Sequence, residues 1–328
     1  MKELDELILY RNPENGQTLK DMDWILDHLE CENDRDMVRS RFFTCMHALI
    51  DLAGTYGFEG NIWHNYLTLL LVNHENVFST SCEIRGLTDG SLLNLAKHDF
   101  SVFMRLFTLD FSRVEEILHV EFFEEILHYK RGTVEGKVFN QRIRNRICEL
   151  SAQLAEHSEA GELEQFTEHM IRFYREFGVG RFGLHKAFRV EHGENGVQIL
   201  PITNIAHVKL DDLVGYEIQK KKLIDNTEAF IQGKKANNCL LFGDAGTGKS
   251  SSIKGILNQY YDRGLRMIEI YKHQFQDLNA VIAQIKNRNY RFIIYMDDLS
   301  FEEFEVEYKY LKAVIEGGLE RKPENVLI

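Results

Sequence analysis

Residues 243–250 read Gly-Asp-Ala-Gly-Thr-Gly-Lys-Ser, which matches the pattern G-x-x-x-x-G-K-[ST] over its whole length. In this pattern the glycines allow successive backbone N–H groups to point inward around an anion. Lys249 can reach the β- and γ-phosphates of a nucleotide, and the Ser250 hydroxyl can bind Mg²⁺. The predicted phosphate-binding residues are Gly243, Asp244, Ala245, Gly246, Thr247, Gly248, Lys249, Ser250 and Ser251.

The residues on either side of this loop predict a strand and a helix. Cys239–Phe242 is a short apolar run of the kind found in buried parallel strands. Residues 253–260 carry apolar side chains at the spacing of one helix face, and Gly264 follows where glycine commonly ends a helix. The alternative, a glycine-rich surface turn with a solvated lysine, would require neither element.

A second apolar run, Phe292–Met296, ends in two acids, Asp297 and Asp298. This pattern is typical of a buried strand that carries its acids to the carboxyl edge of a sheet, beside a phosphate-binding loop. There we expect Asp297 to hold Mg²⁺ through water. Asp298 would polarise the attacking water as a general base. The alternative is an Asp-Asp turn that ends an ordinary strand.

The remaining C-terminal residues predict an alternation of strands and helices. Residues 265–271 and 325–328 have the apolar character of strands, and residues 278–285 form a helical stripe. Ser300 and Glu303 form a capping box that would open a further helix. This alternation predicts an α/β domain with a mostly parallel sheet covered on both faces.

Residues 211–217, Asp-Asp-Leu-Val-Gly-Tyr-Glu, resemble the D-D-x-V-G segment that precedes the phosphate-binding loop of AAA+ ATPases. More closely, residues 209–328 resemble an uncharacterised bacterial group of AAA+-type ATP-binding proteins, a domain of unknown function. The resemblance is carried by residues 226–230, 233–250 and 297–302. It implies a P-loop NTPase core that binds and hydrolyses ATP with Mg²⁺, and an adenine pocket lined by Val214 and Gly215. It implies no substrate.

The chain departs from the AAA+ pattern in two ways. Asp298 stands where that family has Glu, and its shorter side chain reaches less far toward a lytic water. Glu302, one turn further on, could supply a second acid. The sensor residue, arginine finger and helical lid of a complete AAA+ module would follow residue 328, so we expect an incomplete core. A nucleotide-binding switch without turnover is therefore the alternative to an ATPase, followed by a nucleic-acid-loading ATPase and a P-loop kinase.

The N-terminal half predicts helices. The chain has three prolines, and five stretches show apolar residues at helical spacing, namely 39–52, 63–77, 92–107, 114–129 and 141–177. Residues 189–200 read as a β-hairpin around Asn195 and Gly196. We therefore expect a helical bundle or array over residues 1–200 that ends in this hairpin, and the ATP-binding domain over residues 201–328.

Two Glu-x-x-His sequences occur close together, Glu116 to His119 and Glu125 to His128. Di-iron bundles use this spacing. On one straight helix, however, the two copies would be rotated by roughly 180° from each other, at about 100° per residue. Without a turn between them a shared metal is disfavoured, and a solvated Glu/His face is the expected arrangement.

Charge and cysteine usage restrict the partners. Residues 207–328 hold 18 basic and 18 acidic side chains, whereas residues 1–206 hold 21 and 33 and carry the whole net charge of −12. The acidic half is a poor surface for nucleic acid and favours a protein partner. A homo-oligomer is left open. The five cysteines show no C-x-x-C pair and the N-terminus no secretion signal, which favours the cytoplasm. No run is long enough to span a membrane.

Overall fold

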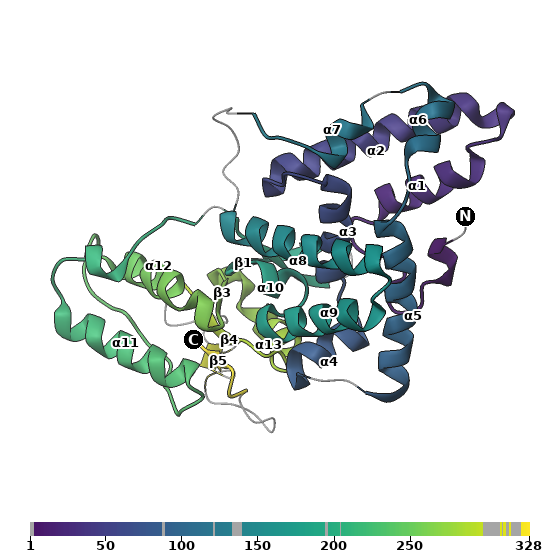
Figure 1. Ribbon diagram of the computed structural model, residues 1–328. Coiled ribbons are helices and arrows are strands. Elements are labelled where there is room, and N and C mark those ends of the chain that lie inside the picture. Colours follow the sequence, from purple (N-terminus) through teal and green to yellow (C-terminus); the bar gives the residue numbers. More distant parts are fainter. Residues whose placement is uncertain are drawn as a thin grey trace. The chain divides into compact units, whose positions relative to one another are not determined.

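The computed structural model describes residues 3–86, 89–120, 122–132, 140–193, 196–203, 205–297 and 323–328, with Lys309, Leu311, Lys312 and Ile315. The chain divides into two compact units, Met1–Gly183 and Leu184–Ile328 (Figure 1). This boundary lies earlier than the expected position near residue 200. The reason is that the hairpin strand β1 (Ala187–Gly193) pairs in parallel with β3 (Leu265–Glu269) and so belongs to the sheet of the second unit.

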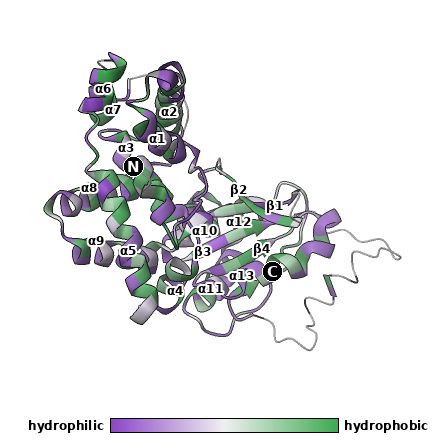
Figure 2. Cartoon of the chain, turned by 90° about the vertical axis from the view of Figure 1, so that its right-hand side faces the viewer, coloured by the Kyte–Doolittle hydropathy of each residue, from purple (hydrophilic) through white to green (hydrophobic). Residues whose placement is uncertain are grey.

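The first unit is mostly helical, as predicted. Its α-helices are α1 (Gln17–His28), α2 (Arg35–Tyr56), α3 (Ile62–Asn73), α4 (Val77–Arg85), α5 (Gly90–Phe107), α6 (Ser112–Leu118), α7 (Phe123–Leu127), α8 (Gln141–Ala160), α9 (Leu163–Phe177) and α10 (Gly180–Leu184), with 3-10 turns η1 (Glu3–Glu6) and η2 (Glu32–Asp34). In Figure 2 the ribbons of α2 and α9 alternate hydrophobic and hydrophilic segments, as amphipathic helices do. None of the described helices combines the length and the apolar content that crossing a bilayer would require.

Two of the expected long helices are each divided in two. The stretch 141–177 forms α8 and α9, because Gly161 takes a left-handed φ of 70° and its N–H caps the carbonyls of His157 and Ser158. The stretch 114–129 forms α6 and α7, because His119 turns to a left-handed φ of 50° and ends α6. Apolar periodicity continues from α8 into α9 because both helices pack against α3 and α5.

The second unit contains a five-stranded sheet in the order β2-β1-β3-β4-β5. β2 (Gly196–Pro201) pairs with β1 antiparallel, and the other neighbours pair in parallel, through β4 (Arg291–Tyr295) to β5 (Val326–Leu327). The described helices are α11 (Glu217–Ile231), α12 (Lys249–Tyr260) and α13 (Leu278–Ile285), with 3-10 turns η3 (Leu210–Asp212), η4 (Tyr261–Arg263) and η5 (Lys272–Asp277). This mostly parallel sheet with helices agrees with the α/β class expected for the C-terminal part.

The expectation of a buried strand at Cys239–Phe242 is wrong. The segment lies beyond the sheet edge formed by β5, where the Cys239 N–H donates to the Ile328 carbonyl at 3.0 Å. The side chains of Leu240 and Phe242 are 74% and 88% exposed. Since β5 covers only two residues, a single backbone hydrogen bond joins the segment to the edge and no ladder forms.

The close approach of α12 to η3 depends on Gly255. A Cβ placed there would lie 2.7 Å from Leu210 Cδ2 and 3.3 Å from the Leu210 backbone nitrogen. We expect Gly255→Ala to destabilise the second unit by about 1 kcal/mol, because overpacking exceeds the gain in helix propensity. At Gly54 of α2 an added Cβ meets nothing within 4 Å. There the same change should stabilise the first unit by about 1 kcal/mol. Calorimetric unfolding of both variants checks the opposite signs.

A half-buried histidine makes the second unit sensitive to acid. Burial, and then the guanidinium of Arg266, lower the pKa of His185 to about 4. In the unfolded chain this pKa is about 6.5, so near pH 5 the unfolded state binds a proton that the folded state does not. Stability is thus complete above about pH 7 and falls as the pH drops toward 4, by about 2 kcal/mol at pH 5.

Calorimetry of His185→Gln at pH 7 and pH 5 tests this sensitivity. The variant should lose less stability on acidification than the wild type does. His207→Gln is the matched control, because His207 is exposed in the same unit. Equal acid sensitivity in the wild type and His185→Gln would refute the assignment.

Candidate functional site

The loop at residues 243–250 has a backbone that only glycine adopts readily. Gly243, Gly246 and Gly248 have φ values of 145°, 80° and 81°. A Cβ added at Gly246 or Gly248 would meet nothing within 4 Å, so open space lies beside the backbone there. Helix α12 begins within this segment, at Lys249. The loop therefore presents its backbone, together with a helix N-terminus, to an open region.

Lys249 folds back over the loop. Its Nζ donates to the carbonyls of Gly243 and Asp244, at 2.9 and 2.8 Å. The Thr247 hydroxyl donates to the Asp244 carbonyl at 2.8 Å, which closes the turn. These bonds are exposed to solvent. The ammonium group thus lies at the loop and can exchange its carbonyl partners for an anion at small cost.

Ser250 and Asp297, the two predicted metal-binding residues, both lie near Tyr295. Ser250 lies in the first turn of α12, and Tyr295 is the last residue of β4. The Tyr295 hydroxyl lies close enough to Ser250 and to Asp297 for both to influence its pKa. Burial, and then the neighbouring carboxylates, raise the pKa of Tyr295 to about 12. The structure thus brings together the loop serine and the strand acid, although they lie far apart in sequence.

A second acid lies at the same edge of the sheet. Glu269 ends β3 and is aligned with Tyr295 of β4. The hydroxyl of Tyr271 donates to Glu269 Oε2 at 3.1 Å, and the carboxylates of Glu269 and Asp297 both raise the Tyr271 pKa. Sequence analysis predicted neither Tyr295 nor Glu269. Their positions in the sequence could have indicated both residues. Tyr295 lies two residues before Asp297, on the same strand face, and Glu269 ends the preceding strand.

The other predicted residues are distributed as follows. Asp244 and Ala245 are exposed in the loop, and Ser251 lies in the first turn of α12. Val214 is 95% exposed and Gly215 has a φ of 90°, both between η3 and α11. In the described part of the chain no hydrogen bond links either residue to the loop. Asp298, Glu302, Ser300 and Glu303 lie outside the described residues.

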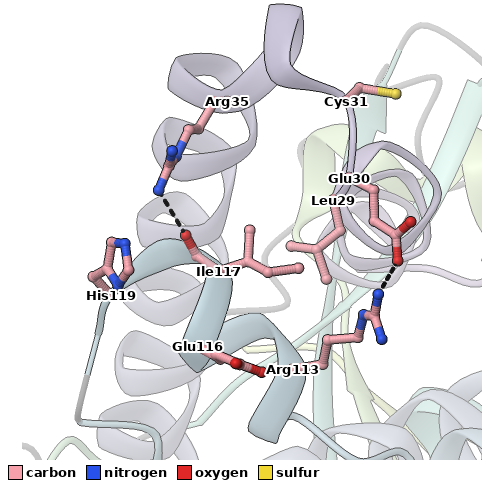
Figure 3. Close-up of a pocket in the computed structure, with 8 residues that line it drawn as sticks. All are labelled: Leu29, Glu30, Cys31, Arg35, Arg113, Glu116, Ile117 and His119. Atoms are coloured by element: carbon pink, nitrogen blue, oxygen red, sulfur yellow. Dashed lines mark hydrogen bonds and ion pairs between the residues drawn. The ribbon is translucent and has the colours of Figure 1, made fainter.

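The helical unit has a pocket of its own, of about 590 Å³ (Figure 3). It is lined by Leu29, Glu30, Cys31, Arg35, Arg113, Glu116, Ile117 and His119. Arg35 donates to the Ile117 carbonyl at 3.1 Å, and Arg113 pairs with Glu30. Cys31 and His119 lie on opposite sides of it in Figure 3.

The two Glu-x-x-His copies do not share a helix. Glu116 belongs to α6, whose cap is His119, whereas Glu125 belongs to α7, whose cap is His128. A turn therefore intervenes between the two copies, and the 180° rotation of a single straight helix does not apply. Over the residues that the structure describes, no group of three or more His, Cys, Asp or Glu side chains could hold a metal ion.

Comparison with known proteins identifies the second unit only as a domain of unknown function. Residues 183–328 match the model of a family described as "Protein of unknown function (DUF815)". The match begins next to Leu184, where the second compact unit starts. The resemblance over residues 209–328 falls within this match. No curated protein and no solved structure matches the chain.

Proposed function

We propose that the second unit binds ATP or ADP together with Mg²⁺, with the phosphates seated in the loop 243–250. The observation that carries this proposal is the geometry of the loop. Three glycines at positive φ lead directly into α12, beside the strand end that bears Asp297. A backbone of this shape points N–H groups toward an anion, and the helix dipole adds to the attraction.

Each described residue has a role that its position supports. The Lys249 ammonium would leave the carbonyls of Gly243 and Asp244 and bind the β- and γ-phosphates. The Ser250 hydroxyl and Asp297, which both lie near Tyr295, would hold Mg²⁺, directly and through water. Open space at Gly246 and Gly248 fits phosphate oxygens, which a Cβ would displace. Magnesium bound there would neutralise charge on the phosphates.

The AAA+ resemblance extends the proposal to adenine. Val214 and Tyr216 are 95% and 58% exposed in the segment between η3 and α11. Exposed apolar side chains can cover a planar base. We therefore propose that Val214 and Gly215 contact the adenine, and that the unit is an AAA+-type P-loop ATP-binding domain.

Hydrolysis is the second part of the proposal. Asp298 would act as the general base. The second candidate is a switch that binds ATP without cleaving it, which the short side chain of Asp298 favours. Phosphate release from Mg·ATP that is lost in Asp298→Asn would support the ATPase, whereas binding without release would support the switch.

The experiment that tests the proposal is calorimetry of the full chain with Mg·ATP and Mg·ADP. Nucleotide at 100 times its Kd should stabilise the second unit by about 2.7 kcal/mol. Both tryptophans, Trp24 and Trp63, lie in the first unit. A nucleotide-dependent change in tryptophan fluorescence would therefore support coupling to the acidic helical unit, which we propose contacts a protein partner. Absence of any binding heat or stabilisation would refute the proposal.

A further inference from the structure

The pocket of the helical unit separates its charged side chains. Figure 3 shows Arg35 and His119 on one side, Glu30 and Arg113 on the other, and Ile117 between them. Arg113 pairs with Glu30, so these two charges compensate each other within the protein. The volume of about 590 Å³ lies within the range of small-molecule sites, roughly 300–1,000 Å³. The pocket can therefore hold a small molecule whose charge matches the side of Arg35.

Arg35 has hydrogen-bond donors available for a ligand. Its guanidinium donates to the Ile117 carbonyl at 3.1 Å, and within the described part of the chain it makes no ion pair. A guanidinium carries five N–H donors, so most of those of this exposed side chain remain unused. The exposed imidazole of His119 adds a ring N–H on the same side. This side is suited to a carboxylate, which accepts two parallel hydrogen bonds from an arginine.

The rest of the pocket restricts what can be attached to that carboxylate. Leu29 and Ile117, which lie in the middle of the pocket in Figure 3, supply apolar surface that an alkyl chain can cover. Glu116 also lines the pocket, and this exposed carboxylate makes no hydrogen bond or ion pair with other described residues. It would repel a second negative charge on the ligand. The pocket therefore favours one carboxylate on an apolar body.

We propose that this pocket binds a small monocarboxylate with an apolar chain, its carboxylate on Arg35 and its chain over Leu29 and Ile117. The site is separate from the proposed nucleotide site, since all its lining residues belong to the first unit. Residues 1–206 carry the whole net charge of −12, so this half of the chain offers an anion no general attraction. Binding must come from local contacts, which single substitutions can test.

The test is calorimetric titration of the full chain with octanoate. Arg35→Gln should weaken binding about tenfold or more, because charge-assisted hydrogen bonds to the carboxylate are lost. The matched control is Arg39→Gln. Arg39 lies one turn further along α2 and donates to the next carbonyl of α6, that of Leu118, but is not among the residues that line the pocket. Both variants lose a contact between α2 and α6, so their unfolding temperatures should fall alike. The control should keep its octanoate affinity within about twofold.

Two further probes and one further variant test the rest of the assignment. Acetate, which lacks the chain, should bind about tenfold more weakly than octanoate. Suberate, the dicarboxylate of the same chain length, should also bind more weakly than octanoate. Glu116→Gln should raise the octanoate affinity about twofold, because it removes a negative charge from the pocket. Such a gain cannot result from misfolding.

Several results would overturn the inference. They are an absence of octanoate binding to the wild type at millimolar concentration, an equal loss of affinity in the two arginine variants, and tighter binding of suberate or acetate than of octanoate. None of these results bears on the proposed nucleotide site, which lies in the second unit.

Discussion

Lys249→Ala is expected to weaken binding of Mg·ATP and Mg·ADP to the second unit by about 10- to 100-fold. The reason is the loss of charge-assisted hydrogen bonds to the phosphates, each worth about 1.5–3 kcal/mol, where 1.4 kcal/mol corresponds to tenfold in affinity. Among the described residues, the Lys249 ammonium makes exposed hydrogen bonds to the carbonyls of Gly243 and Asp244. Water can replace those bonds, so the unfolding temperature without nucleotide should hardly change.

The control for this prediction is Lys254→Ala. Lys254 is exposed on the same helix, α12, one turn further along. Both variants remove one positive charge close to the loop, but only Lys249 is positioned within it. Calorimetry should show that Lys254→Ala keeps its affinity within about twofold, as expected of a screened surface charge. An equal loss of affinity in both variants would mean that nucleotide binding depends on the overall positive charge near the loop. The specific role of Lys249 would then be refuted.

The sequence predicted the sheet best where a strand is buried among neighbours. The runs 265–271 and 292–296 correspond to β3 and β4, and the helical stripe at 253–260 to α12. At these positions most apolar residues are buried, so the local pattern and the tertiary environment agree. Cys239–Phe242 has the same composition, but within the described residues its backbone hydrogen bonding to the sheet edge is limited to Ile328, and Leu240 and Phe242 remain exposed. Composition indicates that a segment can be buried, whereas the number of its neighbours is a property of the fold.

The candidate site was predictable to a similar extent. A glycine pattern specifies a backbone, and the positive φ values of Gly243, Gly246 and Gly248 follow from it. The closeness of Ser250 and Asp297 to Tyr295 could not be predicted in this way. It depends on the register between strands and on how α12 packs over β4. The position of the unit boundary could not be predicted for the same reason. The hairpin was recognisable in the sequence, but the pairing of its strand β1 with β3 was not.

Asp99 of α5 holds the N-terminal segment onto the helical unit. Its side chain is fully buried and accepts four hydrogen bonds from three backbone N–H groups. Ile8 donates to both carboxylate oxygens at 3.0 and 3.1 Å, while Leu9 and Tyr10 donate to Oδ2 at 2.7 and 2.9 Å. Tyr10 in turn places its hydroxyl 2.9 Å from that of Tyr174. The carboxylate therefore fixes a segment that takes part in the core.

Asp99→Ala should destabilise the first unit by about 3–4 kcal/mol, because it leaves buried N–H groups without an acceptor. Asp99→Asn should cost about half as much, since its amide oxygen can replace only one of the two acceptor atoms. Urea denaturation followed by tryptophan fluorescence measures this directly, because Trp24 and Trp63 both report on the first unit. The matched control is Asp89→Ala at the start of α5, where the carboxylate makes no capping hydrogen bond and little change is expected. If Asp99→Ala were no less stable than this control, the segment 8–10 would be held by its apolar contacts alone, and Asp99 would have no structural role.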